Sequence, residues 1–139
     1  MHTFYADSTA DAQEVNENFT ELSDRFDVQE DWHFVGEAGE PAFEDSWVNY
    51  GSPYENASYM KDSMGFVHVR GFVKSGTVGT SATIFTLPAG YRPSDRILMA
   101  TQSNSALGRY DIDSDGKVIP HTGNTLWFSM ANVIFRAEN

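Results

Sequence analysis

The stretch Leu87-Pro88-Ala89-Gly90-Tyr91-Arg92-Pro93 organises this 139-residue chain, because it predicts a corner between two β-strands. Each proline holds φ at about −65° and lacks a backbone donor, and the glycine between them takes a positive φ without steric cost. Residues 82–87 have the β-branched and aromatic content of a strand that ends at the first proline. Another strand begins at residues 96–100. We therefore predict a rigid, bent loop in which Leu87 and Tyr91 are packing anchors.

After residue 42 the sequence has the pattern of short strands and turns that is typical of an all-β protein. Short runs of β-branched and aromatic residues alternate with Gly, Pro, Asp, Asn and Ser, and residues 65–75 show the period of two of a half-buried strand. The DSMG and DSDG sequences at 62–65 and 113–116 are typical of hairpin turns. Eight or nine short strands predict an all-β sandwich, jelly-roll-like in topology.

Three motifs occur in a fixed order: GFVHVRGFV at residues 65–73, FTLPAGYRP at 85–93 and IDSDGKV at 112–118. Together they resemble the C-terminal β-domain of tailed-phage tail fibre and tail-tip receptor-binding proteins that carry an LPAGYRP motif. The resemblance spans residues 47–135. It implies a non-enzymatic structural protein on the virion surface, assembled in the host cytoplasm, that binds a host receptor through several weak sites acting together.

Composition indicates one folded domain. Apolar residues make up 40% of the chain and aromatic residues 14%, and there is no cysteine for a disulfide or a thiolate metal site. No apolar run approaches the roughly 18 to 20 residues of a membrane span, and the N-terminus lacks the pattern of a classical signal peptide. We therefore expect no membrane insertion and no export by such a signal.

The charge balance excludes nucleic acid as an expected partner. Twenty acids face nine bases, so the net charge is −11, and such a surface repels a phosphate backbone. A chain with many acids and few lysines also suits salty surroundings, where screening shortens the reach of self-repulsion. A solvated acidic face is the simpler interpretation.

Residues 8–28 predict the helix of the chain. No Gly or Pro interrupts them, Ser8, Thr9 or Asp11 is placed to cap the N-terminus, and acids fill the first half. The apolar positions are spaced 3, 4, 3 and 4 residues apart, which is a heptad seam. The seam, which is the predicted oligomer interface, consists of Ala12, Val15, Phe19, Leu22 and Phe26.

A helix of this length is marginal alone, so its seam needs a partner. Residues 12–19, AQEVNENF, resemble the start of phage fibre subunits that trimerise. We therefore predict that the short N-terminal helix forms a trimeric coiled-coil-like bundle. A monomer that lays the seam on its own β-domain and another oligomeric state are the alternatives.

Three segments follow from these patterns. Residues 1–35 form the helix and an exit strand, for trimerisation and attachment to other virion proteins. Residues 36–42, GEAGEPA, form a linker. Residues 43–139 form the β-sandwich head.

A partial calcium motif lies at Asp111, Asp113 and Asp115, followed by Gly116. The twelfth position of an EF-hand loop, where a bidentate Glu is required, is Thr122, and no helix flanks the motif. The three aspartates are therefore a weak metal candidate, and we predict no bound metal and no cofactor.

Catalytic signatures are absent from the sequence. The four histidines show no spacing that places two of them on one face as zinc ligands, and no G-x-S-x-G nucleophile motif is present. Acids are abundant, but they fall mainly in the helix and in turns rather than at a cleft. We predict that the chain is not an enzyme.

Aromatic residues exceed what a small sandwich core requires. They include Trp32, Trp47, Tyr50, Tyr54, Tyr59, Tyr110 and Trp127. Two loops, residues 51–56 and 102–108, combine Tyr, Ser, Asn and Gly, as adaptable binding surfaces do. Aromatic faces with nearby amides suit sugars. Tyr54, Asn56 and Asn104 are therefore the predicted receptor-binding residues, although packing is the commoner role of a Trp.

Together these features predict a homotrimeric tail fibre or tail-tip subunit that binds a glycan or protein on the host surface. Because the chain has almost no shaft, a capsid decoration or head-fibre protein is one alternative. A monomeric carbohydrate-binding module, which needs no helix, is the other.

Overall fold

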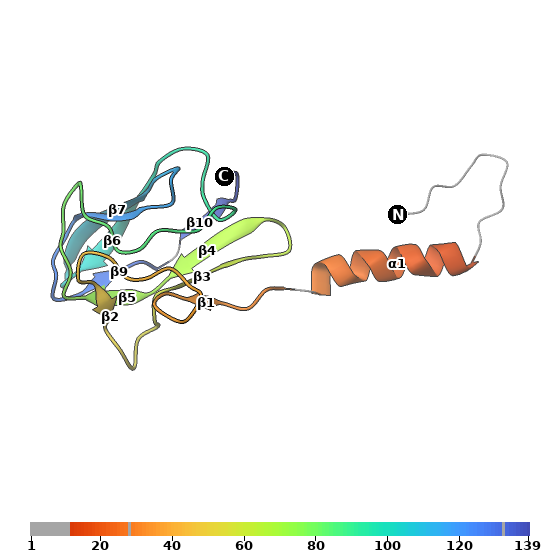
Figure 1. The fold of residues 1–139 in the computed structure, drawn as a ribbon, viewed down its shortest axis with the longest axis horizontal. Coiled ribbons are helices and arrows are strands. Elements are labelled where there is room, and N and C mark those ends of the chain that lie inside the picture. Colours follow the sequence, from red (N-terminus) through yellow and green to blue (C-terminus); the bar gives the residue numbers. More distant parts are fainter. Residues whose placement is uncertain (1–11, 28, 132) are drawn as a thin grey trace.

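The computed structural model describes residues 12–27, 29–131 and 133–139, with the side chains of 25–27 left out. Within these residues it contains one α-helix and ten strands in three antiparallel sheets. Figure 1 shows the helix extending from one end of the β-domain. The strands are β1 His33–Phe34, β2 Val48–Asn49, β3 Ser58–Lys61, β4 Phe66–Arg70, β5 Phe72–Lys74, β6 Ile97–Ser103, β7 Ala106–Ile112, β8 Val118–Thr122, β9 Phe128–Ser129 and β10 Val133–Arg136.

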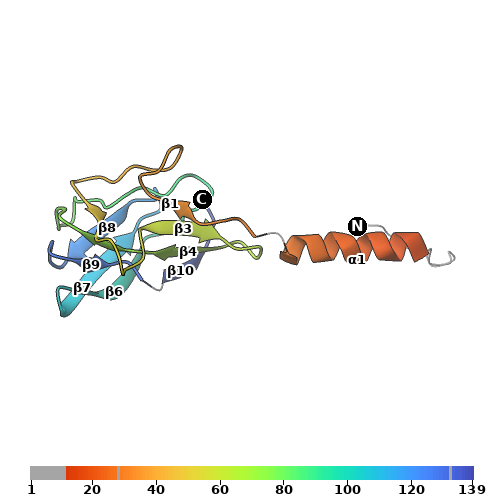
Figure 2. The same ribbon diagram turned by 90° about the horizontal axis from the view of Figure 1, so that it is seen from below.

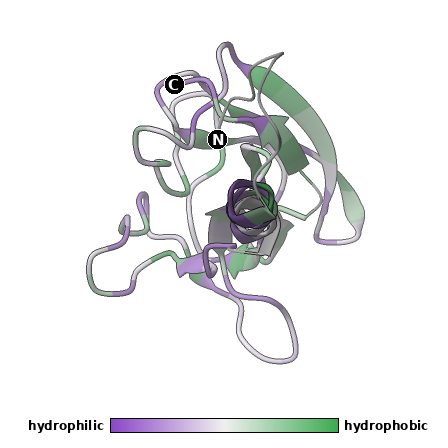
Figure 3. Cartoon of the chain, turned by 90° about the vertical axis from the view of Figure 1, so that its right-hand side faces the viewer, coloured by the Kyte–Doolittle hydropathy of each residue, from purple (hydrophilic) through white to green (hydrophobic). Residues whose placement is uncertain are grey.

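Helix α1 spans Ala12–Asp27, inside the predicted range, and Glu14 in its first turn suits the positive end of the helix dipole. The predicted caps and Val28 lie outside the described residues. Figures 1 and 2 show α1 beyond the β-domain rather than against it, and Phe19 is 68% exposed. The end-on view in Figure 3 shows hydrophobic residues on one side of the helix. In this structure the seam therefore does not rest on the chain's own β-domain.

Strands β4 and β5 are two halves of one strand that bends at Gly71. The sheet β1-β3-β4-β10 contains β4, and the sheet β2-β5-β9 contains β5, so the bent strand joins the two into one layer. The Met130 amide donates to the Gly71 carbonyl at 2.8 Å, which carries the pairing across the bend. The sheet β6-β7-β8 forms the second layer. The structure is thus β-sandwich-like, as predicted.

The alternation of inward and outward side chains that was predicted for residues 65–75 continues through the bend at Gly71. Val67, Val69 and Val73 are buried, whereas Phe66 and Phe72 lie on the outer face. The inner residues meet Tyr59, Phe128 and Phe135 of the same layer and Tyr110, Ile112 and Val118 of the other layer in one hydrophobic core. Alternation alone therefore assigned each side chain of this strand to the correct face.

The prediction of a strand at residues 82–87 is wrong. This segment is extended only in part and forms an isolated bridge between Thr86 and Lys117. The amide of Ile84 donates to Val118, but the carbonyl of Ile84 accepts from Glu44, so the segment bonds to different parts of the chain. Residues 82–85 are all buried, and a chain covered on both sides does not need the alternation of a strand.

The corner at residues 87–93 receives the C-terminus of the chain. Its turn closes with the Tyr91 amide donating to the Pro88 carbonyl at 3.1 Å, and Gly90 has a φ of 91°. The amides of Gly90 and Arg92 donate to the Asn139 carbonyl at 2.9 and 3.1 Å, and Pro93 is buried. Leu87 is fully buried.

The exit strand belongs to the β-domain. Strand β1 pairs with β3, and the Val35 amide continues the pairing with a bond of 3.0 Å to the Ala57 carbonyl. In the predicted linker, the Gly36 amide bonds to the Pro41 carbonyl at 2.8 Å and closes a loop. The division of the chain at residues 36–42 stays a prediction.

Gly71→Ala is expected to destabilise the fold. A Cβ at Gly71 would lie 2.5 Å from the Ala57 Cα, and the φ of 144° already disfavours a side chain. Overpacking and backbone strain together predict a loss of about 2–4 kcal/mol in the free energy of unfolding. The matched control is Gly79→Ala, with a φ of 151° and open space around its Cβ, for which we expect about 1 kcal/mol. Equal losses in urea unfolding would contradict the close approach as the cause.

Candidate functional site

The outer face of the sheet β2-β5-β9 carries aromatic rings. The register places Phe72 opposite Ser129 and Val73 opposite Phe128, and the Trp127 ring stacks on the Phe72 ring. On the other side, the Tyr50 amide bonds to the Phe72 carbonyl at 2.8 Å. We call this surface the aromatic face and define it by Tyr50, Tyr54, Phe72, Lys74 and Trp127.

The rings of the aromatic face form one continuous cluster. Phe72 stacks between Tyr54, at 4.3 Å between ring centroids, and Trp127, at 4.9 Å. Tyr50 meets Tyr54 and Phe72 edge-on at 5.4 and 5.1 Å. Tyr54 is nevertheless 50% exposed and Tyr50 38% exposed. The outer faces of antiparallel sheets are usually polar, so an ordered aromatic cluster here marks a surface for a ligand or a partner.

Lys74 is the cation of the aromatic face. Its ammonium lies 5.1 Å from the centroid of the Tyr50 ring. The other two lysines are engaged within the chain: Lys61 donates to the Gly90 carbonyl at 2.8 Å, and Lys117 lies 3.4 Å from Asp115. No carboxylate of the described residues forms an ion pair with Lys74. In a chain with a net charge of −11, this ammonium is therefore available to an outside anion.

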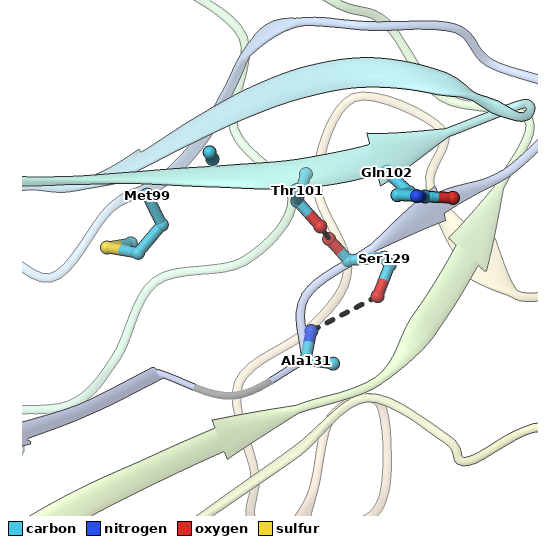
Figure 4. Close-up of a pocket in the computed structure, with 6 residues that line it drawn as sticks. Met99, Thr101, Gln102, Ser129 and Ala131 are labelled. Atoms are coloured by element: carbon cyan, nitrogen blue, oxygen red, sulfur yellow. Dashed lines mark hydrogen bonds between the residues drawn. The ribbon is translucent and has the colours of Figure 1, made fainter.

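A groove of about 410 Å³ adjoins the aromatic face at Ser129 (Figure 4). It lies between β6, an edge strand of its sheet, and the chain that leaves β9. The Thr101 hydroxyl donates to the Ser129 carbonyl at 2.8 Å across the groove. Besides these two residues, the lining includes Met99, Gln102 and Ala131. The aromatic face thus continues into a surface with hydroxyl and amide groups.

Sequence reasoning placed two receptor residues in the loop next to this face. Tyr54 is part of the aromatic cluster, and its amide closes a turn on the Gly51 carbonyl at 3.0 Å. Asn56 is exposed in the same loop, and its carbonyl accepts from the Ser58 hydroxyl at 3.1 Å.

The third predicted residue, Asn104, lies elsewhere. It stands at the turn between β6 and β7 with a φ of 49° and lines a groove of about 250 Å³. Leu107 beside it is 80% exposed. The structure therefore divides the predicted receptor residues between two surfaces.

A cluster of polar side chains joins the segment that follows α1 to the β-domain. The His33 imidazole contacts Glu30 through Nε2 at 2.9 Å and Glu40 through Nδ1 at 2.8 Å. The Tyr59 hydroxyl donates to Glu40 at 2.7 Å, and the Tyr91 hydroxyl donates to Glu30 at 2.6 Å. The His33 ring also stacks on Tyr59 at 5.0 Å between centroids. We call these five residues the neck cluster.

The carboxylates of the neck cluster set the protonation of His33. The hydrogen bond that His33 donates to Glu30, and then the one to Glu40, raise the pKa of His33 above its ordinary value of 6.5. Burial pushes the pKa of Glu30 up, but bonds from Tyr91, His33 and the Lys61 amide outweigh burial, so the pKa of Glu30 is lowered. Bonds from His33 and Tyr59 lower the pKa of Glu40. The cluster therefore favours an imidazolium between two carboxylates.

The tyrosines of the neck cluster act as donors. Burial, followed by the hydrogen bond to Glu30, raises the pKa of Tyr91 to about 12. Burial and the hydrogen bond to Glu40 raise the pKa of Tyr59 as well. Both hydroxyls are therefore protonated across the ordinary pH range and hold the carboxylates in place.

The three aspartates of the partial calcium motif are bonded to cations of the same chain. Asp111 is fully buried and accepts two hydrogen bonds from Arg109 at 3.0 Å. Asp113 accepts from Arg96 at 2.7 Å, a contact that lowers the pKa of Asp113. Across the described ranges, no group of three or more acidic or histidine side chains is placed to hold a metal ion.

Of the residues that the structure describes, none belongs to a helix with the length and apolar character needed to span a membrane.

Residues of the aromatic face that sequence reasoning did not assign to a site are Tyr50, Phe72, Lys74 and Trp127. The alternation of residues 65–75 placed Phe72 and Lys74 on the same side of a strand. This alternation is the sequence feature that could have identified them. The position of Trp127 depends on the pairing of β9 with β5, which is not encoded in either segment alone.

Comparison with known proteins found one solved structure that matches the whole chain. The structure resembles the receptor-binding protein (gp15) of Listeria phage PSA. The alignment covers 100% of this chain and 90% of that protein, with a TM-score of 0.58 and 17% sequence identity. At that identity the likeness shows the fold. No protein-family model and no curated protein matches the sequence.

The neck cluster predicts a maximum in stability against pH. Because the pKa of His33 is raised, its contribution is complete below 6.5 and is lost as pH rises through the folded-state value. The pKa values of Glu30 and Glu40 are lowered, so their contribution is present above 4.5 and is lost as pH falls through the folded-state values. The stabilisation is therefore greatest between pH 4.5 and 6.5.

His33→Gln should lower the urea midpoint most in this window and less at higher pH. His121→Gln is the control, because the His121 imidazole contacts the hydroxyl of Thr122. A loss at His33 that is constant from pH 4 to pH 9 would show that packing, and not the ion pairs, explains the effect.

Proposed function

We propose that this chain is a receptor-binding subunit of a phage tail, present as a homotrimer on the virion. The observation that carries the proposal is the likeness to the receptor-binding protein of Listeria phage PSA, which extends over helix and β-domain together. A match limited to the β-domain would have supported a common sandwich and little more. The three motifs that resemble phage fibre proteins are an independent, sequence-based support.

The homotrimer rests on helix α1. Its seam positions Val15, Phe19 and Leu22 lie on one side of a helix that extends away from the β-domain, and Phe19 is 68% exposed. A 16-residue helix with an open apolar stripe is marginal in water, and packing against identical helices covers that stripe. The N-terminal segment then attaches the trimer to other virion proteins, and three β-domains bind the host together.

Phe19→Asp is expected to convert the trimer to a monomer, because it places a charge in the apolar seam. The measurement is the native mass by light scattering at micromolar concentration. Thr20→Asp is the matched control, since it adds the same charge one position off the seam and should leave the mass unchanged. A native mass of one chain for the unmodified protein would refute the trimer.

Receptor binding without catalysis is part of the proposal. The carboxylates of the neck cluster are bonded to His33 and to two tyrosines rather than left open at a cleft. Asp111 and Asp113 are likewise bonded to arginines. We therefore assign these groups to the structure rather than to catalysis.

Immunogold electron microscopy of intact phage particles tests the location. Label at the tail tip would support the proposal, and label spread over the capsid would instead assign a decoration or head-fibre role. Removal of residues 1–27, which takes away α1 and keeps Glu30 of the neck cluster, separates the remaining alternative. A monomeric carbohydrate-binding module keeps its affinity without the helix, whereas the trimer loses avidity.

A further inference from the structure

We propose that the aromatic face and the adjoining groove bind a bacterial surface saccharide that carries an anionic substituent, such as a phosphate or a carboxylate. This inference rests on the proposed receptor-binding function and names the class of receptor. It commits to one occupant of an exposed sheet face, and three features of that face support the choice.

The first feature is the order of the rings. Phe72 stacks between Tyr54 and Trp127, and Tyr50 contacts Tyr54 and Phe72 edge-on, so the cluster is formed before any ligand arrives. The outward ring surfaces of Tyr54 and Trp127 offer flat apolar areas for the C–H groups of a sugar ring. A preformed surface binds with a smaller loss of conformational entropy.

The second feature is the polar groove beside the rings. Ser129 lies opposite Phe72 on the same face and also lines the groove, so a chain of sugars lying on the rings reaches the groove directly. There the Gln102 amide and the hydroxyls of Thr101 and Ser129 are suited to sugar hydroxyls. The groove of about 410 Å³ has room for one or two sugar units.

The third feature is charge. Lys74 lies among the rings, and no carboxylate of the described part of the chain pairs with it. The chain carries 20 acids and 9 bases, so a cation left open on an apolar face is unusual here. An acidic surface repels polyanions in general. The Lys74 ammonium on the aromatic face therefore favours a ligand that places an anionic group next to this side chain.

The position of the face fits a receptor. In Figures 1 and 2, the sheet β2-β5-β9 lies at the end of the β-domain away from α1. If α1 faces the particle, as the proposed function requires, the aromatic face is carried outward.

The test is binding of the full-length chain to an array of purified bacterial surface polysaccharides. Each phosphate- or carboxylate-bearing polymer is paired with its chemically neutralised form. We expect binding to at least one anionic polymer, at least threefold weaker binding to its neutral form, and weaker binding at high salt.

The variants Trp127→Ala and Lys74→Gln should each reduce this binding, by about tenfold and about threefold respectively. Ile134→Ala and Arg136→Gln are the matched controls, because both residues are exposed and lie on β10, outside the face. Urea unfolding of each variant establishes that it is folded, and Tyr54→Ala replaces Trp127→Ala if the latter is not.

Three results would overturn the inference: no binding to any polymer, binding that the face variants leave unchanged, or binding to neutral polymers alone. A fourth is a smaller native mass for Trp127→Ala, which would make the face a contact between subunits. None of these results affects the tail location, which immunogold labelling decides separately. Conversely, saccharide binding through the face with no label at the tail would refute the proposed function and retain the site.

Discussion

The close approach of Gly71 to Ala57 is the constraint on which the β-domain depends. A Cβ at this glycine would lie 2.5 Å from the backbone of Ala57, so only glycine lets the strand bend there. The bend keeps Val69 and Val73 on the inner side while it turns β5 into a second sheet. The row of outward-facing side chains then continues from β4 into β5, and Phe72 lies at the centre of the aromatic face.

The neck cluster links this domain to the helix. His33 bridges two carboxylates, and Tyr91 brings the corner at residues 87–93 into the same network. That corner also holds the C-terminal Asn139. Segments more than 50 residues apart thus meet in the chain that follows α1, where charge-assisted hydrogen bonds hold Glu30 against the β-domain.

The candidate site could be predicted only in part. Loop composition selected Tyr54, which lies in the aromatic face, and Asn56 in the same exposed loop, because Tyr, Ser, Asn and Gly mark exposed, adaptable loops. Their role in receptor binding stays a prediction. Asn104 was chosen by the same rule, yet it lies on another surface, since composition carries no information on which loops meet. Trp127 was recognised as an excess aromatic residue, but its place beside Phe72 depends on the register between β5 and β9.

The sequence by itself determined the features that neighbouring residues control: the turn at Gly90, the alternation along residues 65–75, and the helix with its apolar seam. These follow from φ preferences and side-chain periodicity over a few residues. Only the tertiary structure decided the pairing of β1 with β3 and the irregular path of residues 80–87. It alone brought Glu30 to Tyr91, because contacts between distant segments depend on how buried side chains pack together, and no local pattern encodes that packing.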